Sequence, residues 1–136
     1  MYETIPTYDA VVIGGGISGM YVIYRLRELG ISFRVFEAGS DIGGPWYWCR
    51  YPGARFDSES WSYGYFFDKE LLQEWDWKEH FSPQPDTLEY LNVVADKHDL
   101  RRDMTFNARM TTAEFDAKSH HRPVTFQDCS PARGTQ

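Results

Sequence analysis

Three glycines and one acid have the types and the spacing of a dinucleotide-binding site. Gly14, Gly16 and Gly19 form a Gly-x-Gly-x-x-Gly pattern, and Glu37 follows 18 residues after Gly19. The first glycine permits a tight turn, the second lets backbone N–H groups approach a pyrophosphate, and the third lets a helix pack closely on a strand. A carboxylate at Glu37 suits ribose hydroxyls and disfavours a 2′-phosphate. We therefore predict that the chain binds FAD or NAD rather than NADP.

The residues around this pattern predict the elements that would hold it in place. The apolar run at 10–13 ends on glycine and is typical of a buried parallel strand, which we place at 8–13. Apolar residues at helical spacing predict a helix over 17–29 that ends at Gly30. A second strand is expected over 32–36, directly before the acid. The alternative is a glycine-rich loop that binds nothing, but strand, helix and acid in register favour the nucleotide site.

The rest of the chain predicts an α/β fold in which a long aromatic loop follows the second strand. The connection over 38–60 is rich in Gly, Pro and aromatic residues, which argues against disorder. We expect a helix over 86–99, opened by a capping box of Asp86 and Glu89. A third parallel strand is predicted at 104–107, and two antiparallel strands are predicted at 111–115 and 124–127. The fold would thus hold three parallel strands, two helices and a short antiparallel extension.

Composition limits the classes of function. The chain has 136 residues, with 14 Lys and Arg against 20 Asp and Glu, so its net charge of −6 gives no reason to expect nucleic acid as a partner. It shows no signal peptide and no apolar run long enough to span a membrane, so we expect a cytoplasmic protein. Cys49 and Cys129 lie far apart and without a Cys-x-x-Cys pattern, which predicts free thiols and no metal site.

Several conspicuous side chains are better explained by packing than by chemistry. His98 on the expected helix is predicted to be a packing residue rather than a ligand. Trp75 and Trp77 are expected to pack under the aromatic loop. Asp41 is predicted to cap a turn. The aromatic content of 17% still exceeds what so small a fold needs, which points to a planar ligand or a partner surface.

The segment Gly-Gly-Pro-Trp-Tyr-Trp-Cys-Arg-Tyr-Pro-Gly-Ala-Arg-Phe-Asp, over 43–57, closely resembles a known family. It is similar to the Gly-Gly-x-Trp-x-x-Asn-x-Tyr-Pro-Gly-x-x-x-Asp region of the Baeyer–Villiger monooxygenases, the class B flavoprotein monooxygenases typified by cyclohexanone and phenylacetone monooxygenases. The likeness covers about residues 8–128. It implies a partial Rossmann-like FAD-binding domain of the GR2 type, with FAD as cofactor and NADPH as co-substrate. It also implies that ketones and O₂ are converted into esters or lactones through a C4a-peroxyflavin.

The resemblance also implies roles for individual residues. The FAD pyrophosphate would be held by the glycine-rich turn, namely Gly14, Gly16, Ile17, Ser18 and Gly19, and the ribose by Glu37. The flavin side of the cofactor would be lined by Gly44, Pro45, Trp46, Tyr47, Trp48 and Tyr63. Asp57 would be the catalytic aspartate close to the flavin and nicotinamide, and Met110 would meet the adenine end. The NADP contacts would begin at Arg55 and Phe56.

The sequence also departs from the family pattern. Members carry a second Gly-x-Gly-x-x-Gly for NADPH and a Phe-x-Gly-x-x-x-His-x-x-x-Trp fingerprint, and neither occurs here. We therefore expect 1–136 to be a truncated, incomplete FAD-binding domain that is inactive by itself. The first strand would keep an open apolar edge on which a complementary chain could pair. Two alternatives stay open: a non-catalytic FAD- or nucleotide-binding fragment, and a related flavin N- or S-oxygenase.

Overall fold

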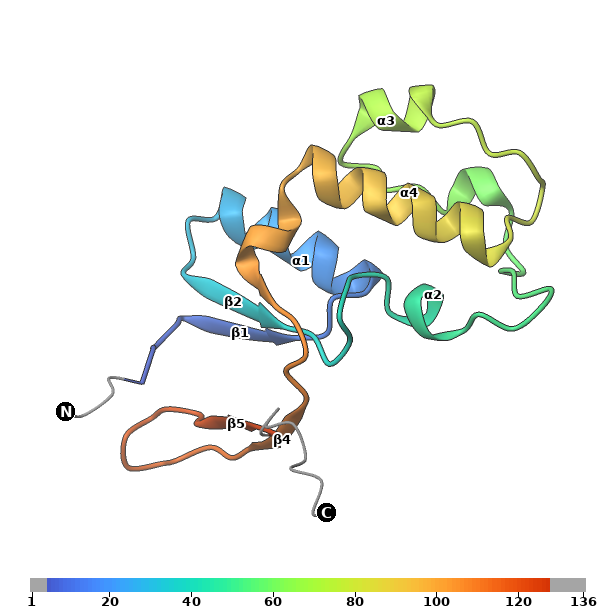
Figure 1. Ribbon diagram of the computed structural model, residues 1–136. Helices are drawn as coiled ribbons and strands as arrows, with labels where there is room; N and C mark the ends of the chain where they lie inside the picture. The colour runs from blue at the N-terminus through green and yellow to red at the C-terminus, as the bar shows by residue number, and fades with distance from the viewer. Residues whose placement is uncertain (1–4, 128–136) are drawn as a thin grey trace, which may run out of the picture.

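Three parallel strands form the central sheet in the order β1-β2-β3. The first two lie side by side in Figure 1. They are β1 (Ala10–Ile13), β2 (Phe33–Phe36) and β3 (Met104–Thr105). In this computed structural model, which describes residues 5–127, Val12 lies opposite Val35, and Val35 lies opposite Met104. The sheet confirms the three predicted parallel strands, although each is shorter than expected.

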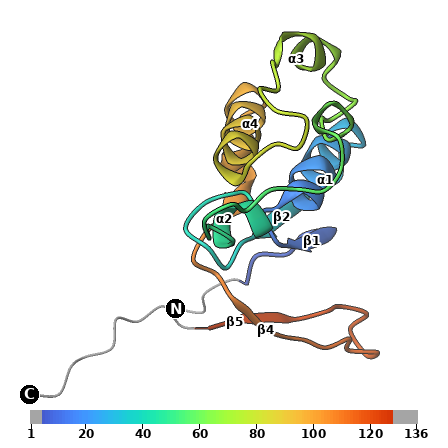
Figure 2. The same ribbon diagram turned by 90° about the vertical axis from the view of Figure 1, so that its right-hand side faces the viewer.

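Two long helices lie on one side of this sheet and a hairpin lies on the other (Figure 2). The helices are α1 (Ile17–Glu28) and α4 (Gln84–Lys97), and the hairpin pairs β4 (Met110–Ala113) with β5 (Val124–Phe126). The core between helices and sheet is aliphatic apart from one tyrosine. Its buried members are Met20, Ile23, Val35, Ile42, Leu71, Tyr90, Leu91, Val94, Ala95, Leu100 and Met104.

The predicted capping box at the start of α4 is wrong. The helix begins at Gln84 with Pro83 as its N-cap residue, so Asp86 lies inside the first turn and caps nothing. The hydroxyl of Thr87 instead donates to the carbonyl of Pro83 at 3.0 Å. Proline at the N-cap and at the second helical position fixes the backbone there and donates no N–H, which lets the helix start two residues earlier.

Between β2 and α4 the chain contains short helices that the sequence did not predict. They are α2 (Pro45–Trp48), the 3₁₀ turn η1 (Ser60–Ser62) and α3 (Lys69–Glu74), followed after α4 by the 3₁₀ turn η2 (Leu100–Asp103). Helices this short are not stable alone, so their stability comes from tertiary contacts. The rings of Trp75 and Trp77 pack against Tyr90 of α4 at centroid distances of 5.4 and 5.0 Å, which confirms their predicted packing role.

Three other expectations concern isolated features. Cys49 is an exposed free thiol, whereas Cys129 lies outside the described residues. His98 packs between aromatic rings and a carboxylate, as predicted for a packing residue. Over residues 5–127 no helix combines the length and the apolar character that crossing a membrane requires.

The edge of β1 is open, as the sequence predicted. In the described part of the chain β1 pairs only with β2, and Val11 and Ile13 are 38% and 47% exposed. These two side chains line a groove between β1 and the hairpin, together with Met110, Phe115 and Val124.

Candidate cofactor-binding site

The glycine-rich turn joins the carboxyl end of β1 to α1. Gly14 has a φ of +106°, which side chains rarely allow, and its N–H donates to the carbonyl of Phe36 at 2.8 Å. A Cβ on Gly19 would lie 1.9 Å from the carbonyl oxygen of Gly14. The first turn of α1 therefore packs on the glycine turn at a distance that only glycine permits, which confirms the predicted role of the third glycine.

The N-terminus of α1 presents free backbone amides. Its first internal hydrogen bond runs from the N–H of Met20 to the carbonyl of Gly16 at 2.9 Å. The amides of Ile17, Ser18 and Gly19 precede that bond and have no acceptor within the helix. No acidic residue lies in the first turn, and no side chain caps it. Free N–H groups and the positive end of the helix dipole make this turn suitable for an anion.

Glu37 is tied to the glycine turn by its carboxylate. Its Oε2 accepts a hydrogen bond from the N–H of Gly15 and its Oε1 accepts one from the N–H of Gly39, both at 2.6 Å. The residue is only 5% exposed. Carboxylate oxygens have further lone pairs beyond these two bonds, so the group can still accept from hydroxyls. The acid thus lies beside the turn at the carboxyl ends of β1 and β2, where ligands bind in sheets of this kind.

A second glycine turn closes on the first. The N–H of Gly43 donates to the carbonyl of Gly15 at 3.1 Å. A Cβ built on Gly16 would lie 3.2 Å from the Cα of Gly44, so the two backbones touch. Gly43 was not among the predicted site residues, although a Gly-Gly pair is a sequence signal for unusual backbone conformation. In the structure Gly43 and Gly44 have φ values of +127° and +55°.

Three of the predicted aromatic residues form a wall after this second turn. The indole N–H of Trp46 donates to the hydroxyl of Tyr63 at 2.8 Å, and the rings of Phe56 and Tyr63 stack at 4.2 Å. The Trp46 ring meets Phe56 edge-on at 5.7 Å. Burial raises the pKa of Tyr63 more than the Trp46 bond lowers it, so its hydroxyl stays protonated. The side-chain amide of Gln84 donates to the carbonyl of Trp46 at 2.5 Å and anchors the wall on α4.

Pro45, Tyr47 and Trp48 belong to the same short helix α2. Pro45 occupies its first turn and Trp48, at 56% exposed, ends it. The Tyr47 and Trp48 rings meet edge-on at 4.8 Å and both lie against Gly39, where a Cβ would come within 2.9 Å of Tyr47. The hydroxyls of Tyr47 and Ser40 are 2.6 Å apart. The helix is therefore packed onto the loop that follows Glu37.

The structure does not bring three of the predicted residues to the glycine turn. Arg55 forms an ion pair with Glu79 at 2.9 Å and donates to the carbonyl of Phe81. Asp57 is exposed, and over residues 5–127 its side chain makes no hydrogen bond or ion pair. Met110 lies on β4 and lines the groove beside Ile13. Their assigned roles remain predictions.

The chain is similar to a known protein family and to individual monooxygenases. Residues 12–64 match the family described as "NAD(P)-binding Rossmann-like domain". The chain is 48% identical over 113 residues to a Baeyer–Villiger monooxygenase of Pseudooceanicola batsensis, covering 82% of the chain and 21% of that protein. It is 46% identical over 115 residues to the phenazine N-monooxygenase PhzNO1 of Lysobacter antibioticus, covering 84% of the chain and 21% of that protein.

A solved structure extends the comparison to three dimensions. The crystal structure of OTEMO in complex with FAD and NADP superposes with a TM-score of 0.84 at 42% identity, over 93% of this chain and 24% of that one. The chain thus spans about a fifth of the length of the curated relatives described here.

Proposed function

Because this chain belongs to the Baeyer–Villiger monooxygenase family, whose N-terminal part it matches, we propose that it forms part of the FAD-binding domain of a ketone-oxidising enzyme. The observation that carries the proposal is the junction of the two glycine turns with the carboxylate of Glu37. The whole enzyme would use NADPH and O₂ and would release esters or lactones. In this proposal residues 5–127 form the part of the enzyme that binds FAD.

The residues present fit FAD. The free amides at the start of α1 would hold the pyrophosphate, and Glu37 would accept the ribose hydroxyls. Gly16 and Gly44 approach each other so closely that a Cβ on either glycine would meet the other. Backbone rather than side chains would therefore lie beside the bound FAD at this point. The Glu37 carboxylate would repel a 2′-phosphate, which favours FAD over NADP in this site.

The aromatic wall would contact the planar part of the cofactor. Trp46, Phe56 and Tyr63 support one another, so they would orient the planar part of the cofactor and keep water from it. The bound FAD supplies the redox and oxygen chemistry. Asp57 would place a negative charge near the flavin and nicotinamide, and Arg55 would begin the NADP contacts. Met110 would meet the adenine end.

The identity of the oxidised substrate has a second candidate. The 46% identity to a phenazine N-monooxygenase supports oxygenation at nitrogen. Incubation of the whole enzyme, rather than of this chain alone, with NADPH, O₂ and either a cyclic ketone or an N-heteroaromatic compound distinguishes the two. A lactone with one added oxygen supports the first candidate, and an N-oxide supports the second.

The test of cofactor binding uses the purified chain. We expect titration with FAD to quench flavin fluorescence at a stoichiometry near one, and NADP to compete poorly. Gly30→Ala serves as the control variant, because Gly30 ends α1 at a φ of +66° with open space around its Cβ position and lies outside the site. Absence of FAD binding, or equal binding of NADP, contradicts the proposal.

We also propose that a complementary polypeptide strand covers the open edge of β1. Support comes from the backbone of β1, an apolar strand that pairs only with β2 among residues 5–127 and so leaves its other edge unpaired. Val11→Lys should leave the fold intact and abolish association, as measured by light scattering. Association that survives this substitution contradicts the proposal.

A further inference from the structure

Tyr65 connects the aromatic loop to the first turn of α1. Its hydroxyl donates to the carbonyl oxygen of Ile17 at 2.6 Å, across 48 residues of sequence. Tyr65 belongs to neither the glycine motif nor the residues that family resemblance assigned. Its contact therefore adds a residue to the cofactor turn that no pattern in the sequence indicated.

The Ile17 carbonyl that accepts this hydrogen bond matters because it shares a peptide unit with the N–H of Ser18. The carbonyl of Ile17 and the N–H of Ser18 belong to one planar, resonance-coupled amide. A donor on the carbonyl oxygen fixes the orientation of that plane and polarises its N–H. The Ser18 N–H is one of the free amides at the N-terminus of α1, where an anion would bind.

Tyr65 is held firmly enough to act in this way. Its own N–H donates to the hydroxyl of Tyr90 on α4 at 2.8 Å, and its ring lies 5.1 Å from that of Phe67. Burial raises the pKa of Tyr65, and the nearby Tyr90 and Tyr63 raise it further. The hydroxyl therefore remains a protonated donor throughout the physiological range.

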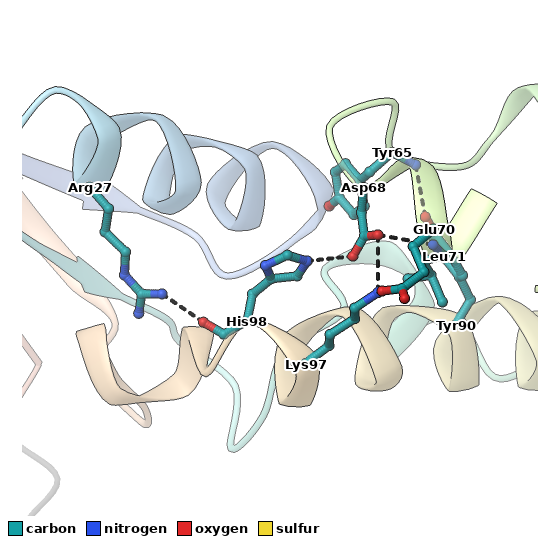
Figure 3. Close-up of polar contacts among 8 residues, drawn as sticks. All are labelled: Arg27, Tyr65, Asp68, Glu70, Leu71, Tyr90, Lys97 and His98. Atoms are coloured by element: carbon teal, nitrogen blue, oxygen red, sulfur yellow. Dashed lines mark hydrogen bonds and ion pairs between the residues drawn. The ribbon is translucent and has the colours of Figure 1, made fainter. Parts of the chain in front are cut away.

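The segment carrying Tyr65 is anchored at its far end by Asp68 (Figure 3). The Asp68 carboxylate accepts hydrogen bonds from the N–H of Leu71 at 2.9 Å, from Lys97 Nζ at 3.1 Å and from His98 Nε2 at 2.7 Å. Arg27 of α1 in turn donates to the carbonyl of His98 at 2.6 Å. Residues 65–68 thus form a strap that is fixed to α4 at both ends. The strap contacts α1 through the Tyr65 hydroxyl on Ile17 and through the ring of Phe67, which stacks on that of Tyr24 at 4.2 Å.

We propose that Tyr65 is a positioning residue for the FAD pyrophosphate, acting through the Ile17–Ser18 peptide unit. This inference rests on the proposed function. Tyr65 touches no reacting atom, and its effect is to hold one amide donor in the direction that the anion requires. Loss of the hydroxyl should leave the turn in place, because Ile17 and Ser18 lie within α1, but it should remove one restraint on this peptide plane and the polarisation of its N–H.

The experiment compares Tyr65→Phe with two controls in the full chain. Tyr24→Phe removes a hydroxyl from α1 that donates to Glu28 at 2.9 Å, and it keeps the ring that stacks on Phe67 of the strap. Val94→Ala lowers stability from a fully buried position in α4 and leaves the Tyr65 hydroxyl in place. We expect Y65F to weaken FAD binding about three- to tenfold, the range of one hydrogen bond, and both controls to bind as the wild type does.

A second readout separates positioning from general loss of stability. The ¹H–¹⁵N resonance of the Ser18 amide should shift in Y65F and stay in place in Y24F and V94A. Equal FAD affinity in Y65F and Y24F, or an unmoved Ser18 resonance, overturns the inference alone. Absence of FAD binding by the wild type overturns the proposed function and this inference with it.

If Y65F does not fold, Tyr90→Phe tests the positioning role of Tyr65 instead. It keeps the Tyr65 hydroxyl but removes the acceptor of its backbone N–H, which loosens the strap. FAD binding must then be weaker than in V94A at equal stability. Equal binding overturns the inference.

Discussion

Gly16 and Gly44 touch backbone to backbone, with a Cβ on Gly44 placed 3.0 Å from the Cα of Gly16. Neither residue can carry a side chain without separating the two glycine turns. This contact brings the start of α1 and the aromatic wall together at one edge of the sheet. The integrity of the cofactor site should therefore depend on it.

Gly44→Ala should weaken FAD binding about tenfold or more, because the added methyl meets fixed backbone. Gly44 also has a φ of +55°, so part of the loss of stability will come from backbone strain. Gly30→Ala is the matched control, since its φ is +66° and its Cβ position is open. Fluorescence titration and urea denaturation of both variants measure the two effects. Equal FAD affinity in the two variants contradicts the prediction.

Glu37→Gln should destabilise the fold by about 1–3 kcal/mol and weaken FAD binding. Both carboxylate oxygens accept backbone N–H bonds, so an amide group must turn its NH₂ toward either Gly15 or Gly39. Glu28→Gln, at an exposed site on α1, controls for the loss of charge. Chemical denaturation checks the stability, and a Glu37→Gln protein as stable as Glu28→Gln speaks against the argument.

Asp68→Asn should lower the free energy of unfolding at pH 7 by about 1–3 kcal/mol. Burial raises the pKa of Asp68, but the hydrogen bonds from Leu71, His98 and Lys97 outweigh it, and the pKa falls below its usual 3.8. A carboxyl whose pKa is lowered by folding stabilises the fold above its unfolded pKa, and this stabilisation is lost as the pH falls through the folded pKa. The difference between wild type and variant should therefore be full above about pH 5 and shrink as the pH falls below about 4.

Denaturation curves between neutral and acid pH test this dependence. Asp57→Asn is the matched control for stability, since Asp57 is exposed and its side chain has no partner in residues 5–127. A difference between wild type and Asp68→Asn that persists unchanged at low pH shows that packing, rather than charge, anchors the strap.

Arg101→Lys should loosen the loop that follows Glu37. The guanidinium of Arg101 joins Asp41 of this loop at 2.8 Å to Asp96 and Asn92 of α4 at 2.6 and 2.5 Å. Lysine keeps the charge but cannot span three acceptors in one plane. We expect about 1 kcal/mol less stability and a several-fold weaker affinity for FAD.

Arg102→Lys is the neighbouring control for this variant. Its side chain is 62% exposed, and its closest carboxylate oxygen, on Asp99, lies 3.6 Å away. Thermal denaturation and FAD titration of the two variants should therefore differ. Equal behaviour would mean that Arg101 acts only through its charge.

The sequence alone determined the local parts of the site. A glycine pattern, an apolar strand and a helical period are read from neighbouring residues, because the backbone freedom of glycine and the repeat of each element act over a few positions. The turn at Gly14–Gly19, both parallel strands around it and the position of Glu37 were therefore predicted. The start of α4 was not, since the two prolines outweighed the capping signal of Asp86.

Only the tertiary structure decided which distant residues meet. The contact of Gly16 with Gly44 and the bond from Tyr65 to Ile17 join segments that no local periodicity relates. The helices α2 and α3 are too short to be stable as isolated peptides in water. They form because the rest of the fold packs against them. Local steric preferences are written into a few consecutive residues, whereas the pairing of distant backbones follows from the packing of the whole chain around one core.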